Sequence, residues 1–282
     1  MKKILITGAN SYIGSSFENY LNKNYNSCYQ IDTLDMINES WKNFDFSSYD
    51  VIYHVAGIAH IKETKDNKDL YYKVNKDLAI EVAKKAKQEN VKQFIFLSSM
   101  SVYGIEKGFI TKDTTLNPKS NYAKSKLQAE EVLKSLQTKD FKICIISPPM
   151  VYGKDCKGNF QSLIKFAKKL PIFPKVKNNR SMIYIDNLSE FVKLLIDNSE
   201  EGLFFPQNNE YSNTSYLVKL LGQSMNKKVR LFIGLGWLIK LSGLVIKKLT
   251  KAFGSLCYDM KLSEYKQNYA LSSLEESIKE SV

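Results

Sequence analysis

The chain has 282 residues, of which 44% are hydrophobic and 25% are charged. This length and balance are typical of one globular α/β domain with a smaller appended region, and they exclude a disordered or fibrous chain. The net charge of +12 comes from lysines spread along the sequence, with Arg180 and Arg230 as the only arginines. Nucleic-acid readers use clustered arginines and aromatic residues, so we expect no nucleic-acid partner. A solvated lysine surface is favoured, with attraction to polyphosphate ligands or an anionic membrane as the alternative.

The N-terminus, the cysteines and the histidines limit the cellular setting and the chemistry. The first apolar run stops at Gly8, too early for a signal peptide, and no stretch is apolar enough to span a membrane. The four cysteines form no C-x-x-C pair, which is typical of reduced thiols. With two histidines, no metal site is expected. We therefore predict a cytoplasmic protein without a metal.

Short apolar runs alternate with longer helical stretches in the first half of the chain. The expected strands are residues 3–7, 28–32, 51–56, 93–99 and 142–147. Each run is continuous rather than alternating, as in a parallel sheet that is buried on both faces. The expected helices between them are residues 12–22, 67–88 and 121–137. This order predicts an α/β fold with a Rossmann-like, doubly wound parallel sheet.

The second half predicts a different organisation. Helices are expected at 159–169, 187–197 and 213–225, no longer separated by regular strands. We therefore expect a dinucleotide-binding domain over residues 1–149 and a smaller substrate-binding region over 150–282, from which the chain crosses back into the sheet in many proteins of this architecture. The apolar segment 231–253 has a basic end and is interrupted by glycines and Lys240. Packing in the smaller region is our interpretation of it, and an amphipathic helix on lipid or on a partner is the alternative.

The sequence "TGANSYIG" follows the first strand and opens the first helix. In such sheets this turn binds a pyrophosphate, because backbone N–H groups and the helix dipole favour an anion there. Gly8 and Gly14 keep the spacing of the glycine pattern, while Ser11 replaces its central glycine. The Ser11 hydroxyl is expected to cap the helix. Together with Tyr12 and Ile13, these residues form the predicted dinucleotide turn.

An acidic residue at the second strand bears on the choice of cofactor. Asp32, at the end of the predicted strand, is placed to accept hydrogen bonds from an adenosine ribose. A carboxylate there would repel a 2′-phosphate, so NAD(H) is favoured over NADP(H). Asp35 is close enough to compete for the role.

The carboxyl ends of the third and fourth strands supply the other candidates. The third delivers the small residues Ala56 and Gly57, and the fourth delivers Ser98, Ser99 and Ser101. Because ligands lie at this edge of an open α/β sheet, these residues are expected to surround the reacting atoms.

One pair on the following helix completes this constellation. Tyr122 and Lys126 are four residues apart and so share a helix face. A nearby ammonium is expected to lower the pKa of the phenol, which makes it a better proton shuttle, while Ser99 hydrogen-bonds the reacting oxygen. The pairs Tyr72/Lys76 and Tyr103/Lys107 have the same spacing but lack a serine-ended strand before them and a glycine turn upstream.

These motifs, with "HVAGIAH", "SSMSVYG", "YAKSK", "PPMVYG" and "NNRSMIYIDNL", resemble the extended short-chain dehydrogenase/reductases of the NAD-dependent epimerase/dehydratase group. The resemblance implies that Ser99, Tyr122 and Lys126 are catalytic and that Asn75 and Pro149 line the nicotinamide. It also implies UDP-sugar contacts from Ser101, Asn159 and Arg180. Members of the family pair through helices equivalent to 67–88 and 121–137, so a homodimer is expected.

The resemblance also limits the reaction. Dehydratases of the family carry an Asp-Glu pair after the catalytic serine or threonine, where this chain has Met100 and Ser101. The motifs look most like 4-ketoreductases that finish UDP-N-acetylfucosamine or UDP-N-acetylquinovosamine for surface polysaccharides. A 4-epimerase is the alternative, although Met150 and the missing Arg-x-Gly-Asp sequence depart from its usual pattern. A dinucleotide sensor without catalysis is the third reading.

Overall fold

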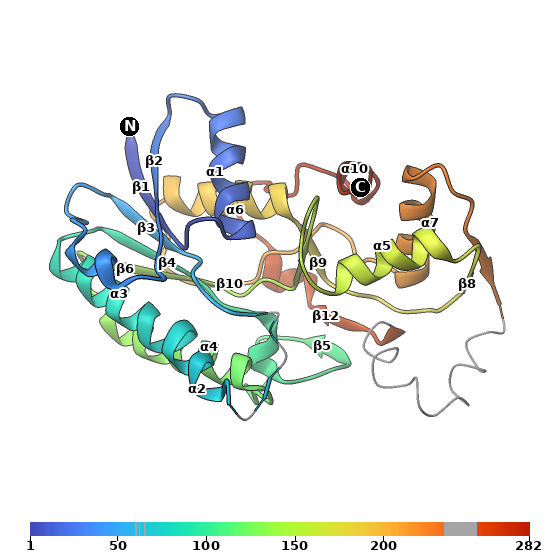
Figure 1. The fold of residues 1–282 in the computed structure, drawn as a ribbon, viewed down its shortest axis with the longest axis horizontal. Helices are drawn as coiled ribbons and strands as arrows, with labels where there is room; N and C mark the ends of the chain where they lie inside the picture. Colours follow the sequence, from blue (N-terminus) through green and yellow to red (C-terminus); the bar gives the residue numbers. More distant parts are fainter. Residues whose placement is uncertain (60, 62, 65, 234–252) are drawn as a thin grey trace. The chain divides into compact units, whose positions relative to one another are not determined.

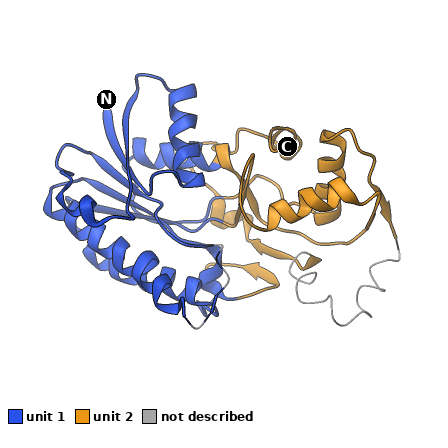
Figure 2. Ribbon diagram, in the orientation of Figure 1, with its two compact units in different colours: residues 1–104, 115–148, 188–206 blue, residues 105–114, 149–187, 207–282 orange. Residues whose placement is uncertain are grey.

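The computed structural model describes residues 1–59, 61, 63, 64, 66–233 and 253–282. The chain is divided into two compact units (Figure 2). Unit 1 consists of residues 1–104, 115–148 and 188–206, and unit 2 of residues 105–114, 149–187 and 207–282. No single position separates them, because the chain returns to unit 1 after residue 187. The sequence predicted one boundary, between residues 149 and 150. One of the boundaries between the two units, after residue 148, lies close to it.

Unit 1 is built on a six-stranded sheet whose neighbouring strands are all parallel. The strand order is β10-β6-β4-β3-β1-β2. The strands are β1 (Lys2–Thr7), β2 (Tyr29–Leu34), β3 (Val51–His54), β4 (Gln93–Leu97), β6 (Lys142–Ile146) and β10 (Gly202–Phe204). The predicted fold class is therefore confirmed. The order reverses between β1 and β3, and ligands bind at the carboxyl ends of strands at such a point.

Helices cover both faces of this sheet, as Figure 1 shows. α1 (Tyr12–Asn24) and α6 (Ile185–Asp197) lie on one face, and α3 (Leu78–Gln88) and α4 (Asn121–Leu136) on the other. The inner strands β1, β3, β4 and β6 are nearly continuous in buried residues because both of their faces are covered, whereas the edge strand β2 has none. On the α3/α4 side the core includes Leu5, Ile52, Phe94, Phe96, Val82, Ala83 and Leu133.

The predicted helix at 67–88 is interrupted. α2 (Lys68–Tyr72) is followed by one π-helical turn, η2 (Lys73–Asp77), before α3 begins. Such turns are frequent at functional sites, because they rotate a side chain away from the regular helical position. Here the turn contains Asn75, which is fully buried.

Unit 2 consists of helices and three two-stranded parallel sheets. The pairs are β7 (Met150–Tyr152) with β9 (Met182–Tyr184), β8 (Ile172–Pro174) with β11 (Arg230–Phe232), and β5 (Gly108–Ile110) with β12 (Leu256–Tyr258). The helices are α5 (Asn159–Lys169), α7 (Thr214–Ser224) and α10 (Leu274–Glu280). Short 3₁₀ turns are η1 (Glu39–Asn43) and η3 (Met100–Tyr103) in unit 1 and η4 (Met260–Ser263) in unit 2.

Several expectations bear on chemistry and location. In the described part of the chain no helix is long and apolar enough to cross a membrane, and no group of metal-binding side chains is found. Cys28 is exposed and the other three cysteines are buried and unpaired. Of the segment 231–253, residues 234–252 lie outside the described residues.

Candidate active site

The turn after β1 brings three strand ends together. Gly8 has φ +112°, a conformation that glycine adopts easily. A Cβ added to it would lie 2.7 Å from the backbone nitrogen of Ala56, so the turn packs directly on the end of β3. The Gly8 N–H also donates to the carbonyl of Leu34, at 2.9 Å. Glycine is therefore required here by backbone geometry and by space.

The helix that follows begins as predicted. Ser11 is the N-cap of α1, and its hydroxyl accepts a hydrogen bond from Gly14 N–H at 3.2 Å. A Cβ on Gly14 would lie 3.1 Å from Ile6 and from Val55, so this glycine allows the helix to approach the sheet. Tyr12 and Ile13 form the first turn, where backbone N–H groups have no partner inside the helix and favour an anion.

Asp32 lies inside β2 rather than at its end. The parallel pairing with β1 continues two residues further, to the pair Thr7 and Leu34, so the strand is longer than its apolar run suggested. The phenol of Tyr49 donates to the Asp32 carboxylate at 3.0 Å. Asp35, the competing residue, is exposed and accepts from the N–H of Ile37 at 2.9 Å. Asp32 is therefore the more firmly held carboxylate.

The loop after β3 is fixed by Asn75. Its side-chain oxygen accepts from Ile58 N–H at 2.9 Å, and its amide nitrogen donates to the Ile58 carbonyl at 3.0 Å. The same nitrogen lies 3.3 Å from the hydroxyl of Ser125 on α4. A Cβ on Gly57 would be 2.9 Å from Asn75 Oδ1 and 3.4 Å from Lys126 Nζ. Asn75 thus holds Gly57 against α4.

Ser99 and Tyr122 are brought together at the end of β4. Ser99 caps η3 and accepts hydrogen bonds from the N–H and hydroxyl of Ser101, at 3.2 and 3.0 Å. The Ser99 hydroxyl also hydrogen-bonds the Tyr122 phenol. Tyr122 stands in the first turn of α4, which is capped by Ser120 and by the carboxylate of Glu63.

The pKa of Tyr122 moves in the direction opposite to the one expected. Burial raises it, and the hydrogen bond from Ser99 opposes that shift. The Lys126 ammonium donates to the carbonyl of Leu97 at 2.8 Å and lies 4.5 Å from the centre of the Phe96 ring. In this arrangement Tyr122 is a protonated phenol at neutral pH.

Lys126 is 4% exposed, and its environment weakens its proton affinity. Burial lowers its pKa to about 8, while Glu130 acts in the opposite direction. Glu130 stands one turn further along α4, is 1% exposed and accepts a hydrogen bond from Ser98. Lys134 lies 3.9 Å from its other oxygen. Burial raises the pKa of Glu130.

Three consecutive residues of the β4 end are therefore tied to one face of α4. Leu97 accepts from Lys126, Ser98 donates to Glu130, and Ser99 bonds Tyr122. Glu130 was missed by the sequence reasoning. Its position four residues after Lys126 was the available signal, because such pairs share a helix face.

His54 was also missed as part of this environment. It is fully buried at the end of β3, with Nδ1 2.8 Å from the hydroxyl of Thr7, and it stacks on Phe94 and Phe96. Burial, with a smaller effect of the Lys126 charge, lowers its pKa to about 3. His54 is therefore a neutral ring beneath the ammonium of Lys126.

The remaining candidates belong to unit 2. Pro149 is buried directly before β7, and Asn159 is exposed at the first position of α5. Arg180 is half-buried, and one guanidinium nitrogen donates to the carbonyl of Gly254 at 3.0 Å. Its backbone is paired with Ser212 through two hydrogen bonds. Burial lowers the pKa of Arg180.

The candidate site in unit 1 combines a glycine turn at the start of α1 with the Tyr122 phenol near the end of β4. The sequence profile of the NAD dependent epimerase/dehydratase family matches residues 4–205. The chain belongs to this family. Its members are extended short-chain dehydrogenase/reductases, so the resemblance noted in the sequence is confirmed.

Two curated relatives are 4-epimerases. The UDP-glucose 4-epimerase of Vibrio cholerae is 27% identical over 254 residues, which is 80% of this chain and 76% of that protein. The N-acetyl-alpha-D-glucosaminyl-diphospho-ditrans,octacis-undecaprenol 4-epimerase of Escherichia coli O157:H7 is 31% identical over 215 residues. That match covers 73% of this chain and 60% of that protein.

Solved structures show the same fold. The UDP-glucuronic acid 4-epimerase of Bacillus cereus in complex with NAD has a TM-score of 0.76 at 21% identity, covering 99% of this chain and 97% of that one. The dTDP-4-dehydrorhamnose reductase of Bacillus anthracis in complex with NADP has a TM-score of 0.72 at 21% identity, covering 99% and 98%. Epimerases and reductases thus share this architecture.

Proposed function

We propose that the protein is an NAD(P)-dependent oxidoreductase that acts at C4 of a UDP-sugar and reduces a UDP-4-keto-6-deoxy-N-acetylhexosamine. The observation that carries the proposal is the attachment of Ser99, Tyr122 and Lys126 to the end of β4, next to the glycine turn. The products would be UDP-N-acetylfucosamine or UDP-N-acetylquinovosamine. They would be made in the cytoplasm and used for the synthesis of surface polysaccharide.

The residues of unit 1 fit a dinucleotide. At Gly8 no side chain blocks the approach to the turn that precedes α1. The first turn of α1 favours a pyrophosphate. Asp32 would accept from the adenosine ribose, which favours NAD(H) over NADP(H). Asn75, through Gly57, would shape the wall beside the nicotinamide. When bound, the reduced cofactor supplies the hydride for C4.

The protein's own groups handle the proton and the negative charge. Tyr122 would donate its phenolic proton to the new alkoxide at C4, and Ser99 would donate a hydrogen bond to the same oxygen. Lys126, one helical turn from Tyr122, would hold the cofactor ribose through its ammonium group, which can donate three hydrogen bonds. A phenol is protonated at neutral pH, so Tyr122 would carry the proton that the alkoxide receives.

Residues after Ser99 separate this reaction from dehydration. Met100 is buried and Ser101 bonds back to Ser99, so neither can act as the acid or base that removal of water requires. In unit 2, Arg180 and Asn159 would contact the UDP-sugar, the former through its phosphates.

A 4-epimerase is the second candidate, because two curated relatives carry that activity in their names. An epimerase must first remove a proton from the C4 hydroxyl, so Tyr122 would have to begin as a phenolate. The positive nicotinium ring of the oxidised cofactor that an epimerase retains would favour this phenolate.

One incubation separates the candidates. The purified protein is mixed with a UDP-4-keto-6-deoxy-N-acetylhexosamine and NADH or NADPH, and in parallel with UDP-N-acetylglucosamine and no reductant. A reductase oxidises one cofactor for each keto sugar consumed and leaves the second mixture unchanged. Formation of UDP-N-acetylgalactosamine in the second mixture would instead establish the epimerase. Binding of cofactor without turnover in either mixture would contradict both.

A further inference from the structure

The positive charge of the chain is concentrated in two stretches that contain no acidic residue. Residues 156–185 and 211–258 hold 15 of the 41 basic residues and none of the 29 acidic ones. The rest of the chain therefore has 26 basic and 29 acidic residues and a net charge of −3. The expectation that the charge is spread along the chain is wrong, because it counted lysines without the acids beside them.

The fold packs these two stretches against each other in unit 2. Within the described residues they form α5, β8, α7 and β11, and α5 contacts α7 while β8 pairs with β11 (Figure 1). The N–H of Arg230 donates to the carbonyl of Pro171 at 2.9 Å, and Lys227 Nζ donates to the carbonyl of Lys168 at 2.7 Å. All the described lysines of both stretches are exposed. Their charges thus lie on the solvent-exposed surface of these packed elements.

Large apolar side chains are exposed on and directly beside the β8/β11 sheet. Leu170, Ile172, Phe232 and Ile233 are 39%, 49%, 56% and 76% exposed, and we call them the apolar tip. Ile172 stands opposite Arg230 in the β8/β11 register, so a cation lies beside the tip. The next residue of β8, Phe173, points inward and is 3% exposed, with ring contacts to Phe166 and Phe253. The outward face is therefore apolar without forming part of the core.

We propose that this surface docks on an anionic lipid bilayer. Lysines attract acidic headgroups. Aliphatic and aromatic side chains are stabilised where they leave water, as they do at the boundary between lipid headgroups and acyl chains. Two copies of the surface would repel each other, because both are positive. A nucleic-acid site would use arginines and stacking rings, whereas lysines and aliphatic tips dominate here. Of the 15 basic residues, 11 lie in the described part of the two stretches, and the proposal rests on these; it is independent of the reaction at C4.

The test is co-sedimentation of the full-length chain with vesicles. One set contains phosphatidylcholine and phosphatidylglycerol in equal amounts, and the other phosphatidylcholine alone. We expect binding to the first set only, and its loss at high salt, because salt screens exposed charges. Binding should also weaken when Phe232→Ser shortens the tip, and it should not change when Leu271→Ser removes an equally exposed leucine outside the two stretches.

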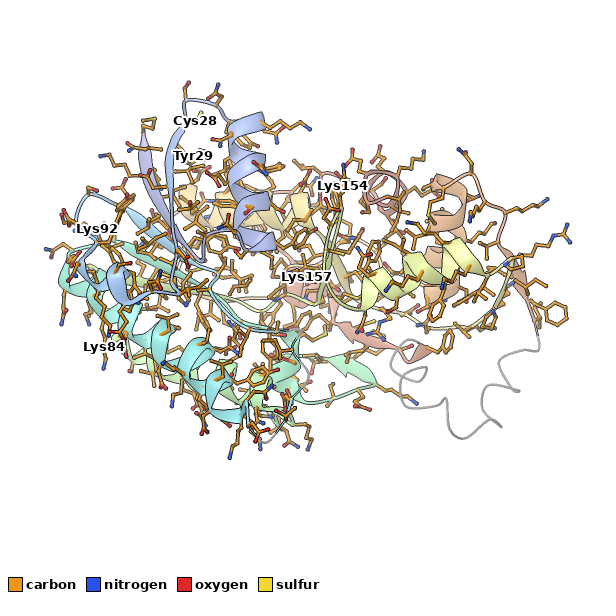
Figure 3. The ribbon with its side chains drawn as sticks, viewed as in Figure 1. Cys28, Tyr29, Lys84, Lys92, Lys154 and Lys157 are labelled. Atoms are coloured by element: carbon orange, nitrogen blue, oxygen red, sulfur yellow. The ribbon has the colours of Figure 1, made fainter. Side chains whose placement is uncertain are left out.

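A charge variant makes the test quantitative. Lys168→Gln/Lys169→Gln should lower the partition coefficient about 30-fold, since each lysine near an anionic surface is worth ~1 kcal/mol. The matched control is Lys84→Gln/Lys92→Gln, which removes two exposed lysines from unit 1 (Figure 3) and should leave binding unchanged. Three outcomes would overturn the proposal. They are an equal loss of vesicle binding in both lysine pairs, tighter binding to DNA than to the vesicles, and self-association that only the Phe232→Ser variant abolishes.

Discussion

Lys126 and Glu130 form a charge pair below the end of β4, and their balance sets the protonation of the site. Without Glu130, burial would lower the pKa of Lys126 further, because the carboxylate is what opposes that shift. Other ionisable groups near this pair are His54 on β3, which is neutral, Tyr103 on η3, and Lys134 and Glu131 on α4. The ammonium form of Lys126 therefore depends mainly on Glu130.

Glu130→Gln should shift the alkaline limb of the pH–rate profile to lower pH. Lys126 has a pKa of about 8, and loss of the carboxylate favours its neutral form, so protonated enzyme disappears earlier as the pH rises. We expect kcat/KM to fall about tenfold on the alkaline side and little below neutrality, since one pKa unit changes the protonated fraction tenfold.

The control for this variant is its exposed neighbour, Glu131→Gln, which should keep the profile of the unmodified protein. A uniform loss of activity at every pH in Glu130→Gln would mean that Glu130 only supports the fold. It would contradict the electrostatic role.

The sequence predicted the site to the extent that its chemistry is local. The spacing of Tyr122 and Lys126 predicted that they share one helix, which α4 confirms, and the position of Ser11 before α1 predicted its cap. The roles of Glu130 and His54, and the direction of the Tyr122 pKa, were missed because they depend on burial and on contacts between distant segments.

At the scale of elements, continuous apolar runs predicted β1, β3, β4 and β6 because these inner strands are buried on both faces of the sheet, whereas the edge strand β2 has no buried residue. β10 was missed since it has only three residues and pairs with β6 only after the chain has passed through unit 2 and α6. The π-helical turn at Asn75 was missed as well, because helical periodicity does not indicate where an extra residue enters a turn.

Gly8→Ala tests the dinucleotide turn as an element. Its Cβ would meet the backbone of Ala56 at 2.7 Å, and φ of +112° would strain any side chain. We expect a loss of about 2–4 kcal/mol in the free energy of unfolding and weaker cofactor binding, from strain and overpacking together. Urea denaturation and cofactor titration measure the two effects.

The matched control is Gly108→Ala. Gly108 has φ +122° but nothing within 4 Å of an added Cβ, so only the strain remains. We expect this variant to lose about 1–2 kcal/mol less of the free energy of unfolding than Gly8→Ala does. Equal costs at the two positions would show that the close approach of the turn to β3 has no energetic importance.

For the whole molecule, we predict a homodimer through the layer formed by α2, η2, α3 and α4. These elements contact one another in unit 1, and Leu70 on α2 is 43% exposed. Leu70→Glu should convert the dimer to a monomer in sedimentation velocity, because a charge would replace buried apolar area. Ile37→Glu, at an exposed position on the loop after β2, should leave the dimer intact. A monomeric unmodified protein would refute this arrangement.

The central claim is that Tyr122 transfers the proton at C4, and single-turnover reduction by Tyr122→Phe tests it most directly. With the 4-keto sugar and reduced cofactor, we expect the rate to fall by about 10²–10⁴-fold, the usual contribution of general acid catalysis, while cofactor affinity stays unchanged. Tyr103→Phe, which alters another tyrosine four residues before a lysine, should retain most of the rate. Turnover by Tyr122→Phe within a few-fold of the unmodified protein would contradict the account.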